Sequence, residues 1–154
     1  MEENIYLPKD RRWNAWVKNN FEYVKSLADR IQLNPRVPEE ITERFDRVKS
    51  LIKFSYFDFQ LLDVASDYSL LTFEMALYHK HSSSEKNRST KRITLDQMLD
   101  WATKNGMLDQ GKEALKSLRV LRNFAAHPRK RQVLGNMAFI LIQSIVDTIN
   151  QLYR

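Results

Sequence analysis

The chain has 154 residues, 43% hydrophobic and 29% charged, which is typical of one globular domain with a single core. It has no cysteine, which excludes disulfides and thiolate metal sites and fits a reducing compartment. The N-terminus lacks an apolar signal segment, and the longest apolar run, 137–142, is too short to span a bilayer. We therefore expect a single cytoplasmic domain over residues 1–154, without a membrane partner.

Few helix breakers, with 3 glycines and 4 prolines, favour long helices. After an N-terminal tail over residues 1–9, apolar residues at helical spacing predict a first helix from Asp10 to Ile31. Prolines at 35 and 38 interrupt the pattern, and a second helix is expected from Pro38. Its predicted buried stripe consists of Ile41, Phe45, Val48, Ile52, Phe59 and Leu62.

The second helical pattern has no clear stop before Tyr78, so it predicts either one long helix or two with a kink near Ser66. Aromatic residues at helical spacing usually become buried, so we interpret the aromatic run as core in preference to a platform for stacking bases. That run contains Phe54, Tyr56, Phe57 and Phe59.

Residues 82–93 are polar without periodicity and predict a flexible loop, either a solvated connector or a basic flap beside a ligand. Thr94 and Gln97 form a capping box for a short helix that Gly106 ends. A further helix begins near Leu108. The final helix, about 133–153, is apolar nearly all round and must be central or covered by a second subunit. The sequence thus predicts an all-α, up-and-down bundle of about five helices.

Positive charge is concentrated before this final helix. Residues 112–131 contain seven Lys and Arg residues and one acid, Glu113, so the net charge of this segment is +6, equal to that of the whole chain. Such localised charge indicates a site for a polyanion, and phosphate is the first candidate.

Arg122 and His127 lie within this segment, at the expected end of a helix. Histidine can transfer protons near neutral pH, and arginine offers a fixed charge with bidentate geometry for phosphate. A structural interpretation is also open, in which Arg122 anchors a carboxylate and His127 caps a helix end. The basic surroundings favour the functional interpretation.

The stretch from Leu118 to Pro128 resembles the signature of the HEPN superfamily, an Arg, a polar residue and then a His shortly before the last helix. The resemblance implies a HEPN-like helical fold and a metal-independent endoribonuclease, with no cofactor. It assigns Arg122 and His127 as catalytic, Asn123 as the polar orienting residue and Glu74 as a supporting acid. Residues expected to bind nucleic acid are Lys112, Lys116, Arg119, Arg129, Lys130 and Arg131.

Members of this superfamily are typically homodimers whose two motifs face each other, and many belong to toxin–antitoxin or phage-defence systems. The resemblance therefore implies RNA, a second copy and an antitoxin protein as partners. An alternative is a non-catalytic relative that binds RNA, a nucleotide or another protein. A DNA-binding repressor is disfavoured because no helix-turn-helix pattern is evident. His79 and His81, without nearby cysteine or a set of acids, indicate surface residues in preference to a metal site.

Overall fold

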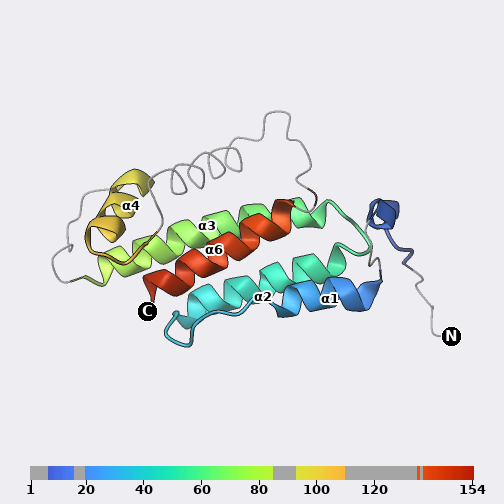
Figure 1. Ribbon diagram of the computed structural model, residues 1–154, viewed down its shortest axis with the longest axis horizontal. Coiled ribbons are helices and arrows are strands. Elements are labelled where there is room, and N and C mark those ends of the chain that lie inside the picture. Colours follow the sequence, from blue (N-terminus) through green and yellow to red (C-terminus); the bar gives the residue numbers. More distant parts are fainter. Residues whose placement is uncertain (1–6, 16–19, 85–92, 110–134, 136) are drawn as a thin grey trace.

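The computed structural model describes residues 7–15, 20–84, 93–109, 135 and 137–154. These ranges contain a 3-10 helix, five α-helices and no strand, which confirms the all-α bundle (Figure 1). The elements in chain order are η1 (Arg11–Ala15), α1 (Phe21–Asp29), α2 (Glu39–Phe54), α3 (Leu61–Ser82), α4 (Leu95–Lys104) and α6 (Met137–Leu152).

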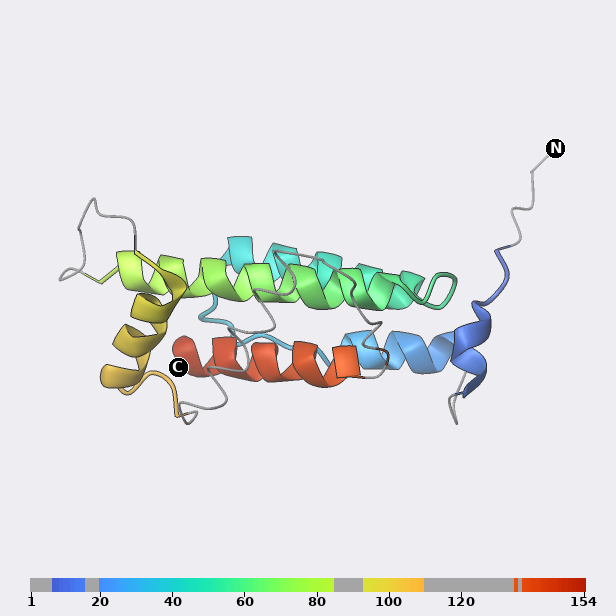
Figure 2. The same ribbon diagram turned by 90° about the horizontal axis from the view of Figure 1, so that it is seen from above.

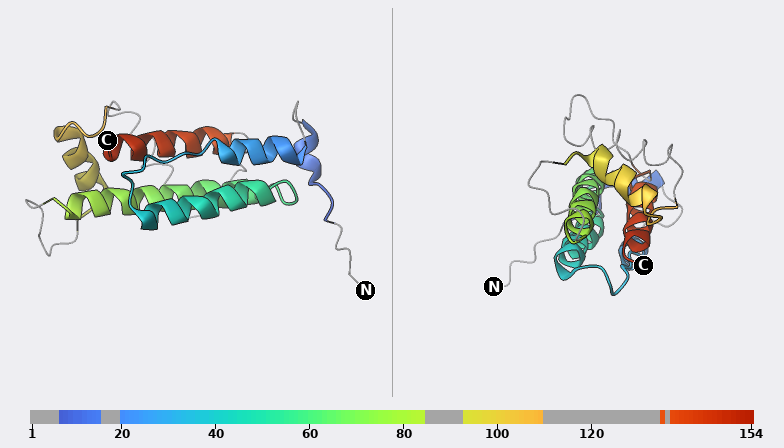
Figure 3. Two further views of the ribbon diagram at one scale, coloured as in Figure 1. Left: turned by 90° about the horizontal axis from the view of Figure 1, so that it is seen from below. Right: turned by 90° about the vertical axis from the view of Figure 1, so that its left-hand side faces the viewer.

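The long helices form two layers (Figure 2, Figure 3). One layer is the antiparallel pair of α2 and α3. The other contains α6, which runs in the same direction as α3, and α1, which ends where α6 begins. The short helix α4 crosses the end of the bundle where α3 and α6 finish.

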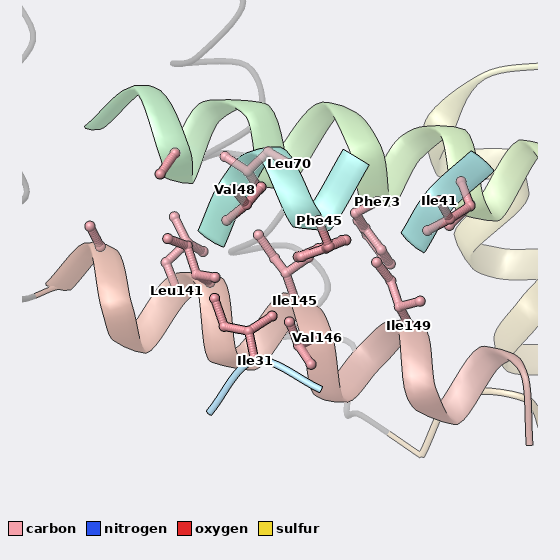
Figure 4. Close-up of a cluster of buried hydrophobic side chains, with 14 of the residues drawn as sticks. Ile31, Ile41, Phe45, Val48, Leu70, Phe73, Leu141, Ile145, Val146 and Ile149 are labelled. Carbon is pink, nitrogen blue, oxygen red and sulfur yellow. The ribbon is translucent and has the colours of Figure 1, made fainter. Parts of the chain in front are cut away.

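The core lies between these layers, and Figure 4 shows a cluster of it built from α2, α3, α6 and the segment after α1. The predicted stripe of the second helical stretch is confirmed, because all six of its residues are buried. Phe45 and Val48 of α2 point toward Ile145 of α6, and Ile31 reaches the same cluster from the segment after α1. Helix α6 is therefore central, as its apolar sequence predicts.

The inner face of α3 carries small residues, which let neighbouring helices approach closely. Its buried hydroxyls do not need partners from other helices. Ser69 Oγ donates to the Ala65 carbonyl at 2.7 Å, and Thr72 Oγ1 donates to the Tyr68 carbonyl at 2.7 Å. A hydroxyl bonded to the preceding turn removes the cost of burying an unpaired polar group.

The second helical stretch is two helices, but the predicted kink near Ser66 is wrong. The chain turns between Phe54 and Leu61, whereas Ser66 is buried inside α3 and donates to the Asp63 carbonyl at 2.9 Å. A residue from a distant part of the chain stabilises this turn. The buried indole of Trp13 donates to the Ser55 carbonyl at 2.6 Å. This contact spans 42 residues and has no local signature in the sequence.

Asp10 fastens the N-terminal segment to the same turn. Its carboxylate accepts from the Phe59 backbone N–H at 2.9 Å and from the backbone N–H and guanidinium of Arg12, while its own N–H donates to the Tyr56 carbonyl at 2.9 Å. The hydrogen bonds from the Arg12 side chain, and then that from Phe59, hold the pKa of the Asp10 carboxyl well below its ordinary value, although partial burial opposes them.

The predicted first helix is wrong in its extent. It is divided into η1 and α1, and α1 has its own N-cap, since the Asn20 side chain accepts from the Tyr23 N–H at 2.8 Å. Phe21, one of the apolar residues at helical spacing in this stretch, is exposed at the start of α1, and its ring packs at 5.6 Å from the ring of Tyr56. Of the aromatic run, Phe59 is buried, whereas Phe54 is exposed.

Three predicted helix ends are confirmed. Pro38 is the N-cap of α2, which places Glu39 and Glu40 in the first turn. Thr94 and Gln97 form the capping box of α4, with the Thr94 hydroxyl accepting from the Gln97 N–H at 3.3 Å. Gly106 follows α4 with φ of 67°, a conformation that glycine adopts at little cost.

The extended segment after α1 is held along α6 by Asn150. The Asn150 amide donates to the Gln32 carbonyl at 3.0 Å and accepts from the Asn34 N–H at 2.7 Å. One side chain thus satisfies both a backbone acceptor and a backbone donor, as a neighbouring strand would. We call this pair of bonds the Asn150 clasp.

Candidate functional site

Of the predicted site residues, Glu74 alone lies within the described ranges. The motif residues Arg122, Asn123 and His127 lie outside the described residues. The same holds for the predicted nucleic-acid-binding residues Lys112, Lys116, Arg119, Arg129, Lys130 and Arg131.

Glu74 lies in the C-terminal half of α3 and is half-buried. Its neighbour Phe73 is 2% exposed and contributes to the core, so the backbone at Glu74 is held by packing. Glu74 also takes part in an interaction with another group. A half-buried carboxylate on a rigid helix is well suited to hold a cation in a fixed direction.

Two further acids of α3 accompany Glu74, and sequence reasoning did not single them out. Asp63 and Asp67 precede Glu74 by eleven and seven residues, spacings that return to the same side of an α-helix. Both are half-buried, and Oδ1 of Asp67 is shielded from solvent. Like Glu74, both take part in interactions with other groups. We call Asp63, Asp67 and Glu74 the acidic edge of α3.

The acidic edge has a definite electrostatic character. Three carboxylates along about three turns of one helix produce a negative potential that attracts arginine or lysine. Because these carboxylates are partly buried, the effective dielectric constant around them is lower than in water, and their attraction to a nearby cation is stronger. The spacing of seven from Glu74 could have revealed Asp67 in the sequence, but only its burial distinguishes it from a surface charge.

The two histidines near the end of α3 have roles within the fold. His79 Nδ1 is 3.1 Å from the Tyr153 hydroxyl, and this hydroxyl donates to the Ala76 carbonyl at 3.0 Å. The ammonium of Lys80 lies 4.9 Å from the centre of the Tyr153 ring. Burial raises the pKa of Tyr153 to about 12, so this side chain stays neutral under ordinary conditions.

His81 packs edge-on against the ring of Trp101 at 4.9 Å, which joins the end of α3 to α4. His79 and His81 therefore take part in two different contacts, one with Tyr153 and one with Trp101. Within the described ranges, no three His, Cys, Asp or Glu side chains are grouped so that they could hold a metal ion.

Comparison of the chain with family models, with curated proteins and with solved structures finds no match. In the described part of the chain, no helix is both long enough and apolar enough to cross a bilayer.

Proposed function

We propose that this protein is a metal-independent endoribonuclease of the HEPN type, acting in a toxin–antitoxin or phage-defence system. The observation that carries the proposal is the sequence from Arg122 to His127 within a segment that holds charge equal to the net +6 of the chain. The all-α bundle is compatible with it, and the acidic edge of α3 offers the supporting carboxylates that such a site needs.

The proposed reaction uses the substrate's own nucleophile. The 2′-OH of a ribose attacks the adjacent phosphorus and forms a new P–O bond, while the bond from phosphorus to the 5′-oxygen breaks. His127 either accepts the 2′-OH proton or donates a proton to the departing 5′-oxygen, because an imidazole titrates near neutral pH, and water carries out the other proton transfer. Arg122 stabilises the extra negative charge on the pentacovalent phosphorus. The products are a 2′,3′-cyclic phosphate and a 5′-OH.

Glu74 and Asp67 act as positioning residues in this proposal. A guanidinium held by a half-buried carboxylate keeps one orientation, so less conformational entropy is lost when the phosphate binds. Asn123 orients the neighbouring groups, and two copies contribute one motif each to a shared groove.

The first test uses 5′-end-labelled RNA with an excess of EDTA. We expect wild-type protein to cleave it and leave 2′,3′-cyclic phosphate ends, and His127→Ala to lose cleavage while keeping its helical circular dichroism. His81→Ala is the matched control, because this histidine packs against Trp101, and it should cleave like wild type. RNA binding without cleavage by the wild type would instead support a non-catalytic RNA-binding module.

Glu74→Gln tests the positioning role. Losing the charge should reduce kcat about tenfold to a hundredfold with little change in KM, as expected when an interaction matters mainly in the transition state. Glu43→Gln, at an exposed position of α2, is the matched control and should leave both parameters unchanged. Equal activity of Glu74→Gln and wild type would remove Glu74 from the site.

The shared groove is tested by mixing. Arg122→Ala and His127→Ala proteins, each inactive alone, should recover part of the activity when combined, because a mixed dimer contains one intact arginine and one intact histidine. If the mixture stays inactive although both variants dimerise, the motifs do not share a groove.

A further inference from the structure

Two arginines of α2 converge on one tyrosine of α3. Arg44 and Arg47 lie about one turn apart, and the Nη1 atoms of both donate to the Tyr68 hydroxyl, at 3.5 Å and 3.0 Å respectively. The Arg44 guanidinium also lies over the Tyr68 ring, 5.7 Å from its centre. Arg47 is exposed, whereas Arg44 and Tyr68 are half-buried. We call these three residues the Arg–Tyr cluster, and it is open to solvent.

This arrangement differs from the one that the sequence of α2 favours. Glu40 and Glu43 precede Arg44 and Arg47 by four residues, a spacing at which acids and bases on a helix commonly pair. Within the described residues, however, neither arginine forms an ion pair. Glu43 attracts Arg47 at longer range, but both acids are exposed and solvent screens them. Both guanidiniums instead contact a neutral phenol, so no carboxylate directly neutralises their charges.

The cluster has more donors than acceptors. The Tyr68 oxygen accepts from both guanidiniums, which leaves its own O–H to be donated. In the described part of the chain, no hydrogen bond uses that O–H. Each guanidinium also keeps N–H donors beyond the one bonded to Tyr68. A ligand here therefore meets positive charge and donors, which suits a group rich in negatively charged oxygen atoms.

The core beneath the cluster holds it in place. Phe45 and Val48 directly follow the two arginines and are buried, and Ser69, which follows Tyr68, is buried as well. The packing of α2 against α3 thus fixes the backbone at all three positions. Because the guanidiniums share one acceptor, their rotamers are restricted before a ligand arrives, and less entropy is lost on binding.

We propose that the Arg–Tyr cluster binds a phosphate monoester, the terminal phosphate of a small molecule or of an RNA chain. Such a group carries a charge of about −2 near neutral pH, which matches two guanidiniums. Its three terminal oxygens accept from Arg44, from Arg47 and from the Tyr68 O–H. A phosphodiester or a carboxylate carries one charge less. The proposal does not depend on RNA cleavage, because these residues lie outside the motif from Arg122 to His127.

The experiment follows the arginine side-chain Nε–H signals of the full chain by NMR while methyl phosphate is added at constant ionic strength. The signals of Arg44 and Arg47 are assigned by their loss in Arg44→Gln and Arg47→Gln. We expect both to shift together and to saturate with one dissociation constant. Dimethyl phosphate, which has one charge less, should bind at least about tenfold more weakly. The proposal is overturned if only other arginine signals shift, or if both phosphates bind equally.

Variants test which groups hold the phosphate. Tyr68→Phe keeps the ring but removes the O–H and the shared acceptor, so the dissociation constant reported by both arginine signals should rise about tenfold. Arg30→Gln with Arg36→Gln is the control, because it removes two exposed arginines that precede α2. This control should leave the dissociation constant within about twofold of wild type. Equal weakening by the control would mean that only net charge matters and would overturn the site.

Two RNAs identify the source of the phosphate. Both are the same short 2′-O-methyl RNA, which has no 2′-OH and is not cleaved, and one has a 5′-phosphate whereas the other has a 5′-hydroxyl. If the 5′-phosphorylated form alone shifts the Arg44 and Arg47 signals, below the concentration that methyl phosphate needs, the site binds an RNA end. If neither form binds there better than methyl phosphate, the ligand is a small phosphate monoester. If the 5′-hydroxyl form shifts both signals equally well, phosphodiesters suffice and the proposal is wrong.

Discussion

Asp10→Asn tests whether a single carboxylate fixes the N-terminal segment on the turn between α2 and α3. Asparagine keeps an acceptor for one backbone N–H but loses the charge-assisted bonds from Arg12 and Phe59. A hydrogen bond to a charged group contributes about 1.5–3 kcal/mol. The Arg12 side chain is 40% exposed, so its ion pair adds at most about 1 kcal/mol.

The expected loss is therefore about 2 kcal/mol in the free energy of unfolding, or roughly 4–8 °C in Tm for a chain of this length. Chemical denaturation followed by circular dichroism measures it. Asp58→Asn is the control, because Asp58 is an exposed acid that meets the same guanidinium at 3.4 Å, and its loss should cost less than about 1 kcal/mol.

The effect should also depend on pH. The folded-state pKa of Asp10 lies below the ordinary value of 3.8, so its contribution is complete above that pH and is lost as the pH falls through the folded value. The difference between wild type and Asp10→Asn should thus be constant near neutrality and shrink below about pH 4. A difference that stays constant down to pH 2, or no difference at pH 7, would refute this role for the carboxylate.

Three further outcomes are expected. Asn150→Leu should lower the free energy of unfolding by about 2–4 kcal/mol, because the Gln32 carbonyl and the Asn34 N–H each lose their hydrogen bond to the Asn150 side chain. Unfolding in urea measures this loss, and a free energy equal to that of wild type would contradict it. The raised pKa of Tyr153 predicts that stability falls between about pH 10 and pH 12, and Tyr153→Phe should flatten this fall in alkaline denaturation. Lys116→Glu with Arg119→Glu should weaken RNA binding and lower the salt slope by about one for each lost phosphate contact; an unchanged slope would exclude them from the interface.

The parts of the fold that follow from local sequence were predictable. The stripe of α2 repeats every three or four residues and becomes buried because that helix packs against both α3 and α1. The caps at Pro38, Thr94 and Gly106 depend on backbone groups within a few residues, so each has a local signature.

The turn between α2 and α3 was not predictable in the same way. Its residues are aromatic and keep the spacing of a buried helix, and no glycine or proline marks the end of α2. The turn is stabilised by Trp13 and Asp10, which lie more than forty residues earlier in the chain. Hydrogen bonds over that separation cannot be read from a local pattern.

The candidate site, too, was only partly predictable from the sequence. The resemblance selects Glu74. The spacing of seven residues places Asp67 on the same side of α3, but acids at helical spacing usually face solvent, so the spacing does not distinguish Asp67 from a surface charge. Its shielded oxygen is a property of the folded chain. Likewise the nearly all-apolar sequence of α6 indicates a central helix, yet only the structure shows that Met137 and Ile140 remain exposed while Leu141 and Ile142 enter the core.

The Asn150 clasp has a consequence for how the chain matures during translation. Asn34 and its partner Asn150 are separated by 116 residues. At about 5–20 residues per second, the ribosome needs roughly 6–23 s to make the intervening chain. Throughout this interval the nascent segment after α1 and the inner face of α2 have no α6 to pack against. Newly made chains should therefore engage chaperones until α6 emerges from the ribosome.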